Sequence, residues 1–202
     1  RCLSSKNTTM EDINAVYNML DYPVSNFTIG IKDDVTNLSL EPISLEYQKK
    51  AQEILIYGYG SDGSVSASKS LIKIIGENTD KYVQGYFQYD SKKSGGVTRS
   101  HMRIANDKIK KPYYVNNPSL VVVSKEEYIY KYDVIDNLCD GGTLFLNTKL
   151  GKDKLIASLP NKIKYLLAKK NVNFYVIDAY SLVNRLGLKN KISTCMEACI
   201  IS

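Results

Sequence analysis

One stretch of the sequence restricts the fold more than any other, because it joins a buried strand to a helix through closely spaced glycines. The apolar run EILIYG opens into a G-x-G-x-x-G pattern at Gly58, Gly60 and Gly63. A helical pattern follows, with Ser64 as the expected N-cap and Gly76 as the expected end of the helix. Strand, glycine turn and helix in this order are typical of an α/β fold.

Strand and helix patterns alternate along the rest of the chain. Strands are expected at residues 82–89, 97–104, 120–123, 143–147 and 173–178. Helices are expected between them, at residues 126–138, 152–170 and 179–187. This alternation predicts an open, mostly parallel, twisted sheet with helices on both faces, as in Rossmann-like proteins.

The first fifty residues have a different character. Residues 8–21 predict a capped helix, and residues 27–40 predict an extended arm whose charges make it a poor core strand. We therefore expect two parts, a linker helix with a connecting arm over residues 1–50 and an α/β domain over residues 51–202. The chain begins with Arg and stops within an apolar run, so we expect a piece of a longer polypeptide, with the domain truncated at its C-terminus.

The glycine loop indicates an anion-binding site, because such a backbone can approach a ligand and the first amides of the helix point at it. A plain tight turn between strand and helix is the alternative that needs no ligand. A phosphate loop of the GxxxxGK type is excluded at this position, since Lys69 comes too late and the glycine loop contains no Gly-Lys dipeptide.

Residues after the second strand bear on which ligand the loop would hold. Asp90 occupies about the place of the acid that binds the ribose of NAD. Lys92 and Lys93 follow it closely and favour a ribose that carries a phosphate, as in NADP or coenzyme A. An ordinary solvated turn is the other interpretation of these lysines.

Long blocks of sequence, in a fixed order, resemble one known family. The blocks include YGYGSDGSVSASKSLIKIIGENTD from Tyr57, QGYFQYDSKKSGGVTRSHMR from Gln84, GGTLFLNT from Gly141 and FYVIDA from Phe174. They closely resemble the coenzyme A-binding middle domain, of the gamma type, of the single-chain pyruvate:ferredoxin (flavodoxin) oxidoreductase. The resemblance covers roughly residues 10–202.

The resemblance implies an enzyme that decarboxylates pyruvate oxidatively, passes electrons to ferredoxin or flavodoxin and forms acetyl-CoA. This domain would bind and position coenzyme A, and the other domains of the same polypeptide would carry thiamine diphosphate, Mg²⁺ and [4Fe-4S] clusters. Full-length chains would form a homodimer. The residues implied to contact coenzyme A are Gly60, Ser61, Asp62, Gly63, Ser64, Lys92, which would bind a phosphate, and Ser193, which replaces a family Asn.

No catalytic or metal-binding residue is expected within this chain. It has no run of cysteines that could hold an iron–sulfur cluster and no thiamine motif, so this fragment alone should bind without turnover. His101 is the only histidine, and we expect a structural role for it, because acid–base catalysis requires a partner within reach. An NADP-binding oxidoreductase domain and a purely structural spacer remain the alternatives.

Composition limits the partners and the compartment. The net charge of +6 is too small to indicate nucleic acid, but it suits an anionic small ligand. The four cysteines form no C-x-x-C pair, which favours reduced thiols in a cytoplasmic or similarly reducing, anaerobic compartment. No apolar run is long enough to predict a membrane span.

Overall fold

We describe the protein from a computed structural model, in which residues 8–31, 33–44, 51–60, 62–90, 96–188 and 191–201 are placed. The chain divides into two compact units. One unit joins Arg1–Lys49 with the segment Lys110–Tyr114, and the other contains Lys50–Ile109 and Val115–Ser202. The division into domains of residues 1–50 and 51–202 stays a prediction.

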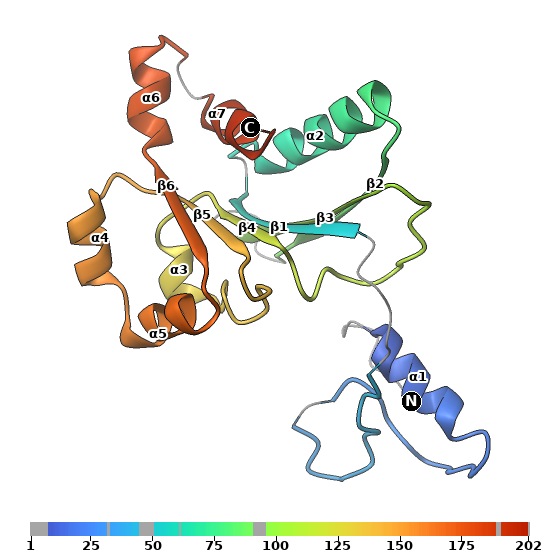
Figure 1. Ribbon diagram of the computed structural model, residues 1–202. Helices are drawn as coiled ribbons and strands as arrows, with labels where there is room; N and C mark the ends of the chain where they lie inside the picture. Colours follow the sequence, from blue (N-terminus) through green and yellow to red (C-terminus); the bar gives the residue numbers. More distant parts are fainter. Residues whose placement is uncertain are drawn as a thin grey trace. The chain divides into compact units, whose positions relative to one another are not determined.

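A six-stranded sheet forms the centre of the larger unit, with the strand order β2-β3-β1-β4-β5-β6 (Figure 1). The strands are β1 (Ala51–Tyr59), β2 (Tyr82–Tyr89), β3 (Val97–Ala105), β4 (Leu120–Val123), β5 (Thr143–Asn147) and β6 (Asn173–Ile177). β1, β4, β5 and β6 run parallel, whereas β3 pairs antiparallel with both β1 and β2. β2 is therefore an edge strand. The predicted α/β class with an open, mostly parallel sheet is confirmed.

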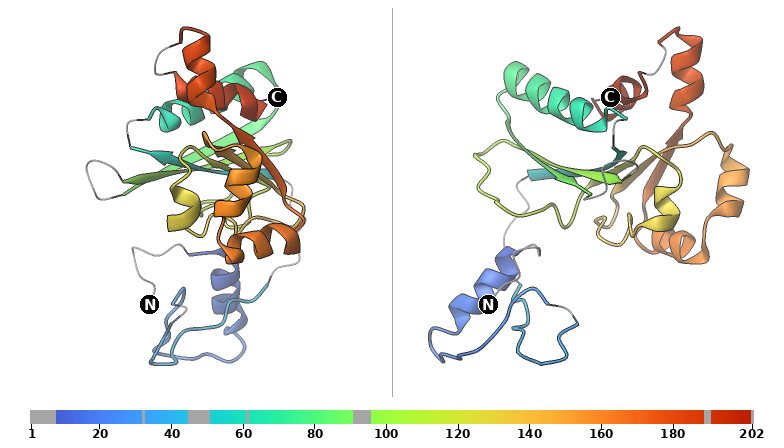
Figure 2. Two further views of the ribbon diagram at one scale, coloured as in Figure 1. Left: turned by 90° about the vertical axis from the view of Figure 1, so that its left-hand side faces the viewer. Right: turned by 180° about the vertical axis from the view of Figure 1, so that it is seen from behind.

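Helices cover both faces of this sheet, as predicted (Figures 1 and 2). One face carries α2 (Ser64–Asn78), α6 (Ala179–Arg185) and α7 (Ile192–Ile201), and the other carries α3 (Tyr128–Lys131), α4 (Lys152–Ser158) and α5 (Asn161–Lys169). Successive side chains of a strand point to opposite faces, so β1 contributes to both cores. Ile54 and Ile56 belong to the cluster with Leu71 of α2, whereas Leu55 belongs to the cluster with Leu155 of α4.

Several helices differ from their predicted extents. The single helix predicted over residues 152–170 is divided into α4 and α5 at Pro160, because proline has no amide hydrogen and its ring blocks a continuing helix. The helix predicted over residues 126–138 is reduced to α3. α2 continues through Gly76 to Asn78, so the prediction that Gly76 ends this helix was wrong.

The smaller unit contains α1 (Met10–Asn18), which is shorter than the helix predicted over residues 8–21. Thr9 and Asp12 form a capping box, in which the Asp12 amide donates to the Thr9 hydroxyl and the Thr9 amide donates to the Asp12 carboxylate. In the arm that follows, the Asp34 carboxylate accepts hydrogen bonds from the amides of Thr36, Leu38 and Ser39. The Asp34 carboxylate therefore stabilises the loop that contains Thr36, Leu38 and Ser39.

The antiparallel part of the sheet buries a cluster of polar side chains. The Nε of Arg103 donates to Glu53 at 2.9 Å, and an Nη of Arg103 donates to Gln84 at 3.0 Å. Beside them, the Nδ1 of buried His101 accepts a hydrogen bond from the Val115 amide at 3.2 Å. Burial, together with two nearby arginines, lowers the pKa of His101 to about 4. These contacts support the structural role expected for His101.

Candidate functional site

Glycine is required at two positions around the turn from β1 to α2, one in the loop and one near the end of β1. Gly63 is the N-cap of α2 and has a φ of +81°, a left-handed conformation that side chains disfavour. A Cβ atom at Gly63 would also lie 2.7 Å from the Oγ of Ser193, so α7 approaches the loop backbone closely. At Gly58, where β1 meets the first turn of α2, a Cβ atom would clash with Ser64. The glycines therefore permit a tight turn and close helix–strand packing.

Asp62 holds this loop in shape through both oxygens of its carboxylate. One oxygen accepts a hydrogen bond from the Ser64 amide at 2.8 Å. The other accepts from the Tyr59 amide at 2.8 Å and from the Ser124 hydroxyl at 2.9 Å. The N-cap is Gly63, so the prediction that Ser64 caps the helix was wrong, because the Asp62 carboxylate binds the amide of Ser64 and makes it the first helical residue.

The start of α2 has the properties of an anion-binding helix end. The helix is fifteen residues long, its N-cap makes no side-chain hydrogen bond, and its first turn contains no acidic residue. Its first amides and the positive end of the helix dipole favour negatively charged groups at this end, where the Asp62 carboxylate already binds the Ser64 amide. The role of the glycine loop in holding a ligand stays a prediction.

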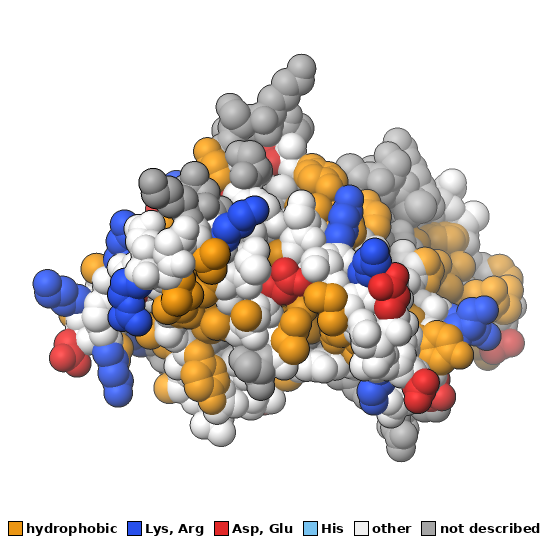
Figure 3. All heavy atoms as spheres, turned by 90° about the horizontal axis from the view of Figure 1, so that it is seen from above, with side chains coloured by type: hydrophobic (Ala, Val, Ile, Leu, Met, Phe, Trp, Pro, Cys, Tyr) orange, Lys and Arg blue, Asp and Glu red, His pale blue; other side chains and the backbone are white. Residues whose placement is uncertain are grey.

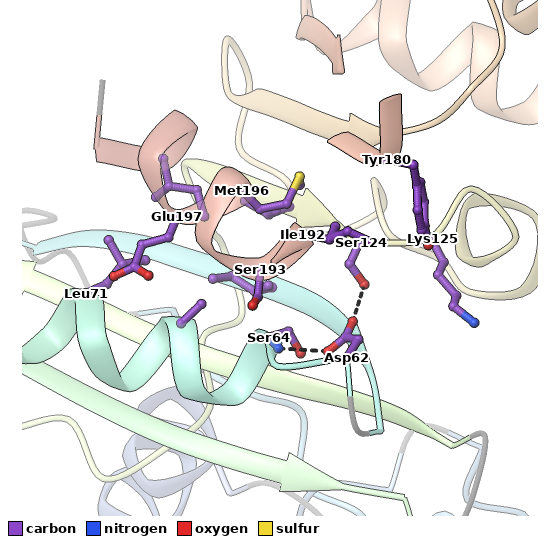
Figure 4. Close-up of a pocket in the computed structure, with 14 residues that line it drawn as sticks. Asp62, Ser64, Leu71, Ser124, Lys125, Tyr180, Ile192, Ser193, Met196 and Glu197 are labelled. Atoms are coloured by element: carbon purple, nitrogen blue, oxygen red, sulfur yellow. Dashed lines mark hydrogen bonds between the residues drawn. The ribbon is translucent and has the colours of Figure 1, made fainter. Parts of the chain in front are cut away.

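A pocket with a cavity volume of about 220 Å³ lies beside the loop (Figure 4). Its apolar lining comes from β1, β4 and the facing sides of α2 and α7, and it includes Ile56, Leu71, Val122, Met196 and Ile200. Its polar groups are Asp62, Ser64, Ser124, Lys125, Tyr180, Ser193 and Glu197. Ligand pockets commonly measure about 300–1,000 Å³, so this one would enclose only part of a nucleotide-sized molecule.

Basic side chains lie at the pocket and next to it. The Nζ of Lys125 is 3.5 Å from the ring centroid of Tyr59, a cation–π contact, and no described carboxylate forms a salt bridge with it. The Nζ of Lys149 is 5.0 Å from the ring centroid of Tyr180. Figure 3 shows this side of the molecule, where basic and acidic side chains alternate with apolar ones.

The structure brings part of the predicted site together. Asp62, Ser64 and Ser193 line one pocket, although Ser193 is far from the others in sequence. Ser193 lies where it would meet a Cβ atom at Gly63, and the amide of Gly60 donates to the carbonyl oxygen of Gly96 at 3.1 Å. Ser61 and Lys92 lie outside the described residues, and so does Lys93.

The sequence reasoning missed Ser124, Lys125 and Tyr180. Ser124 and Lys125 follow directly after β4, and Tyr180 follows shortly after β6. Ligands of open α/β sheets bind outside the carboxyl ends of parallel strands, so polar residues directly after each predicted strand were the signal that could have found them.

Other kinds of site are absent from the described residues. They contain no group of three His, Cys, Asp or Glu side chains that could hold a metal ion, and no helix long and apolar enough to cross a membrane. Cys139, Cys195 and Cys199 form no disulfide bond within the described part of the chain, and burial raises the pKa of Cys195, which keeps it protonated. Cys2 lies outside the described part.

Comparison with known sequences identifies the family of this chain. Residues 53–202 match the sequence model of the family described as pyruvate ferredoxin/flavodoxin oxidoreductase. The chain belongs to this family. It is 39% identical over 205 residues, 99% of this chain, to the pyruvate-flavodoxin oxidoreductase of Trichormus variabilis. It is 41% identical over 206 residues, also 99% of this chain, to the pyruvate dehydrogenase [NADP(+)] of Cryptosporidium parvum.

These pyruvate oxidoreductases are much longer proteins. The chain spans 17% of the Trichormus protein and 11% of the Cryptosporidium protein. Among solved structures, pyruvate oxidoreductase subunit PORC from Thermotoga maritima is similar, with a TM-score of 0.57, 26% identity and 76% coverage of each chain. The 2-oxoglutarate:ferredoxin oxidoreductase of Magnetococcus marinus, determined with 2-oxoglutarate, coenzyme A and succinyl-CoA bound, has a TM-score of 0.53. At 15% identity, over 72% of this chain and 23% of the other, this likeness shows the fold alone.

Proposed function

We propose that this chain binds and positions coenzyme A for a pyruvate:ferredoxin or pyruvate:flavodoxin oxidoreductase. The observation that carries the proposal is the N-terminus of α2, where the N-cap Gly63 has no side chain to bind the helix amides, beside a pocket that Ser64 and Ser193 line. Backbone amides in this position bind phosphate groups. Coenzyme A was bound in the Magnetococcus structure that shares this fold, so it is the first ligand to test.

The proposed contacts are those that the family resemblance implied. The loop residues Gly60, Ser61, Asp62, Gly63 and Ser64 would surround the phosphates, with Ser193 from α7 and Lys92 on a phosphate. We add Lys125, because this residue lines the pocket and its ammonium group is held against the Tyr59 ring. Asp62 would act chiefly through the loop, since its carboxylate oxygens bind Tyr59, Ser64 and Ser124.

The remaining steps of the reaction would take place in other parts of the longer protein. Thiamine diphosphate with Mg²⁺ would form the adduct with pyruvate, and [4Fe-4S] clusters would pass electrons to ferredoxin or flavodoxin. This chain would hold coenzyme A for acetyl transfer and would not be catalytic by itself. We propose residues 51–202 as the coenzyme domain and residues 1–50 as the connecting part, within a homodimer in a reducing, cytoplasmic compartment.

Calorimetric titration of the chain with coenzyme A, dephospho-coenzyme A and NADP tests this proposal against its alternatives. Coenzyme A is expected to bind with modest affinity that falls as salt is added, because charged phosphates supply part of the attraction. Dephospho-coenzyme A is expected to bind more weakly, and Lys92→Gln should remove that difference. Preference for NADP would indicate the dinucleotide alternative. Absence of binding to all three ligands would leave the structural spacer.

A further inference from the structure

A series of hydrogen bonds runs along the carboxyl edge of the sheet, from the glycine loop to α6. The Ser124 hydroxyl donates to Asp62 at 2.9 Å, and the Asn147 amide group donates to the Ser124 carbonyl oxygen at 3.0 Å. The Ala179 backbone amide then donates to the side-chain oxygen of Asn147 at 3.0 Å. We call Asp62, Ser124, Asn147 and Ala179 the edge chain.

The edge chain is buried where it crosses the sheet. Asn147 is 1% exposed and Ala179 is 0% exposed, so water does not compete for the bonds between them. Asn147 uses its donor toward β4 and its acceptor toward α6, and the side-chain amide of Asn supplies both groups at one position. Breaking one of these buried hydrogen bonds leaves a polar group without a partner. The free-energy cost of such a group is larger than the net contribution of a hydrogen bond that water can replace.

Both ends of the edge chain reach the pocket. At one end, Asp62 fixes the amides of Tyr59 and Ser64 and thereby the shape of the glycine loop. At the other end, Ala179 is the first residue of α6 and precedes Tyr180, which lines the pocket. Figure 4 shows the link between Ser124 and Asp62, with the labelled Tyr180 side chain on the other side of Ser124.

We propose that Ser124 and Asn147 are positioning residues of the coenzyme site. These two residues join the glycine loop to the first turn of α6. They thereby hold the loop amides and the pocket-lining Tyr180 in one arrangement in the ligand-free protein. Groups that are already held in place lose less freedom on binding, so the ligand binds more tightly. The identity of the ligand rests on the proposed function, whereas the coupling of loop and helix does not.

Ser124→Ala tests the proposal, and Ser119→Ala is its matched control. The Ser119 hydroxyl donates to the Glu53 carbonyl oxygen at 3.1 Å, at the opposite end of β4. Both variants remove one serine hydroxyl beside the same strand, so both should lower the Tm. Only Ser124→Ala should weaken coenzyme A binding, by about three- to tenfold, the effect of one lost hydrogen bond. Ser124→Thr, which keeps the hydroxyl, should restore most of the affinity.

Amide hydrogen exchange gives a readout that needs no ligand. In Ser124→Ala, exchange should become faster at the Ser64 amide and also at the Ala179 amide, which is two bonds further along the edge chain. In Ser119→Ala both amides should exchange as in the unchanged protein. If the unchanged protein does not bind coenzyme A, the proposed function fails. The exchange measurement still shows whether the edge chain couples the glycine loop to α6.

A second variant tests whether the edge chain acts as one unit. Asn147→Ala should weaken coenzyme A binding as Ser124→Ala does. The double variant should bind coenzyme A only slightly more weakly than the single variant with the larger loss of affinity. A folded Ser124→Ala protein that binds coenzyme A like Ser119→Ala would overturn the proposal. So would unchanged exchange at Ser64 and Ala179, whatever the result of the binding measurement.

Discussion

The Arg103 guanidinium lies 2.9 Å from the Glu53 carboxylate, and their side chains are only 3% and 7% exposed. Removing one partner of a buried pair leaves an uncompensated charge, so Arg103→Met should lower the free energy of unfolding by about 3–5 kcal/mol. The double variant Glu53→Leu, Arg103→Met should recover most of this loss, because neither charge is then buried alone. Urea denaturation measures both effects.

An exposed pair supplies the control for this prediction. Lys131 and Glu127 are 3.1 Å apart, with side chains that are 62% and 66% exposed. Lys131→Met should change the free energy of unfolding by less than about 1 kcal/mol, since solvent screens such pairs. A similar loss for Arg103→Met and Lys131→Met would contradict the importance given to burial.

Two glycines with similar backbones separate turn strain from ligand binding. Gly63 and Gly141 have φ values of +81° and +70°, and of the two only Gly63 has a neighbour, Ser193, within 4 Å of the place that a Cβ atom would take. Gly141→Ala should destabilise the fold by about 1 kcal/mol, because this residue must keep a left-handed conformation. Gly63→Ala should cost at least as much, because its Cβ atom would also meet Ser193. Only Gly63→Ala should also weaken coenzyme A binding in calorimetry. Equal affinities for the two variants would argue against a ligand at this loop.

Lys125 should contribute charge to ligand binding. Lys125→Gln is expected to weaken coenzyme A binding about three- to tenfold and to reduce its dependence on salt, because one cation near the phosphates is lost. Lys131→Gln is the matched control, since Lys131 lies six residues further on and pairs with Glu127. Titration with coenzyme A at low and high salt distinguishes the two variants. If the affinities of both variants depend on salt to the same extent, Lys125 does not contribute charge to the site.

His101 should make stability depend on pH. Its pKa is lowered from 6.5 to about 4, chiefly by burial, so between these values the unfolded chain binds a proton that the folded protein does not bind. The contribution of His101 is therefore complete above pH 6.5 and is lost as the pH falls toward 4, by about 3 kcal/mol. Urea denaturation from pH 7 to 4 should show a smaller loss for His101→Gln, whose side chain does not titrate. An identical slope for both proteins would refute this prediction.

The local sequence pattern was sufficient to predict the position of several strands of the sheet. The predicted limits of β2, β4 and β5 agree with the structure, because turn residues bound each of these apolar runs. The helix predicted over residues 126–138 failed for a physical reason. Val134, Ile135 and Leu138 are buried in the core from turns that follow α3, and buried turns can imitate the spacing of an apolar helical face.

The candidate site could be predicted only in part. The glycine spacing and the helix after it are local features, so Asp62, Gly63 and Ser64 could be found from the sequence. The bond between Ser124 and Asp62 depends on β4 lying next to β1, a tertiary arrangement that no short pattern contains. The same applies to Asn147, which lies within a strand and has no local sequence signal for its two partners.

The composition of β2 has a consequence for handling the isolated protein. This edge strand has no Asp, Glu, Lys or Arg between Tyr82 and Tyr89, and all three of its tyrosines are exposed. Natural sheets commonly protect an edge with charge, a bulge or a proline, because an unprotected edge recruits strands from other molecules. Concentrated samples should therefore form oligomers through this strand, and a lysine placed on it offers a direct way to keep the chain dispersed for titration.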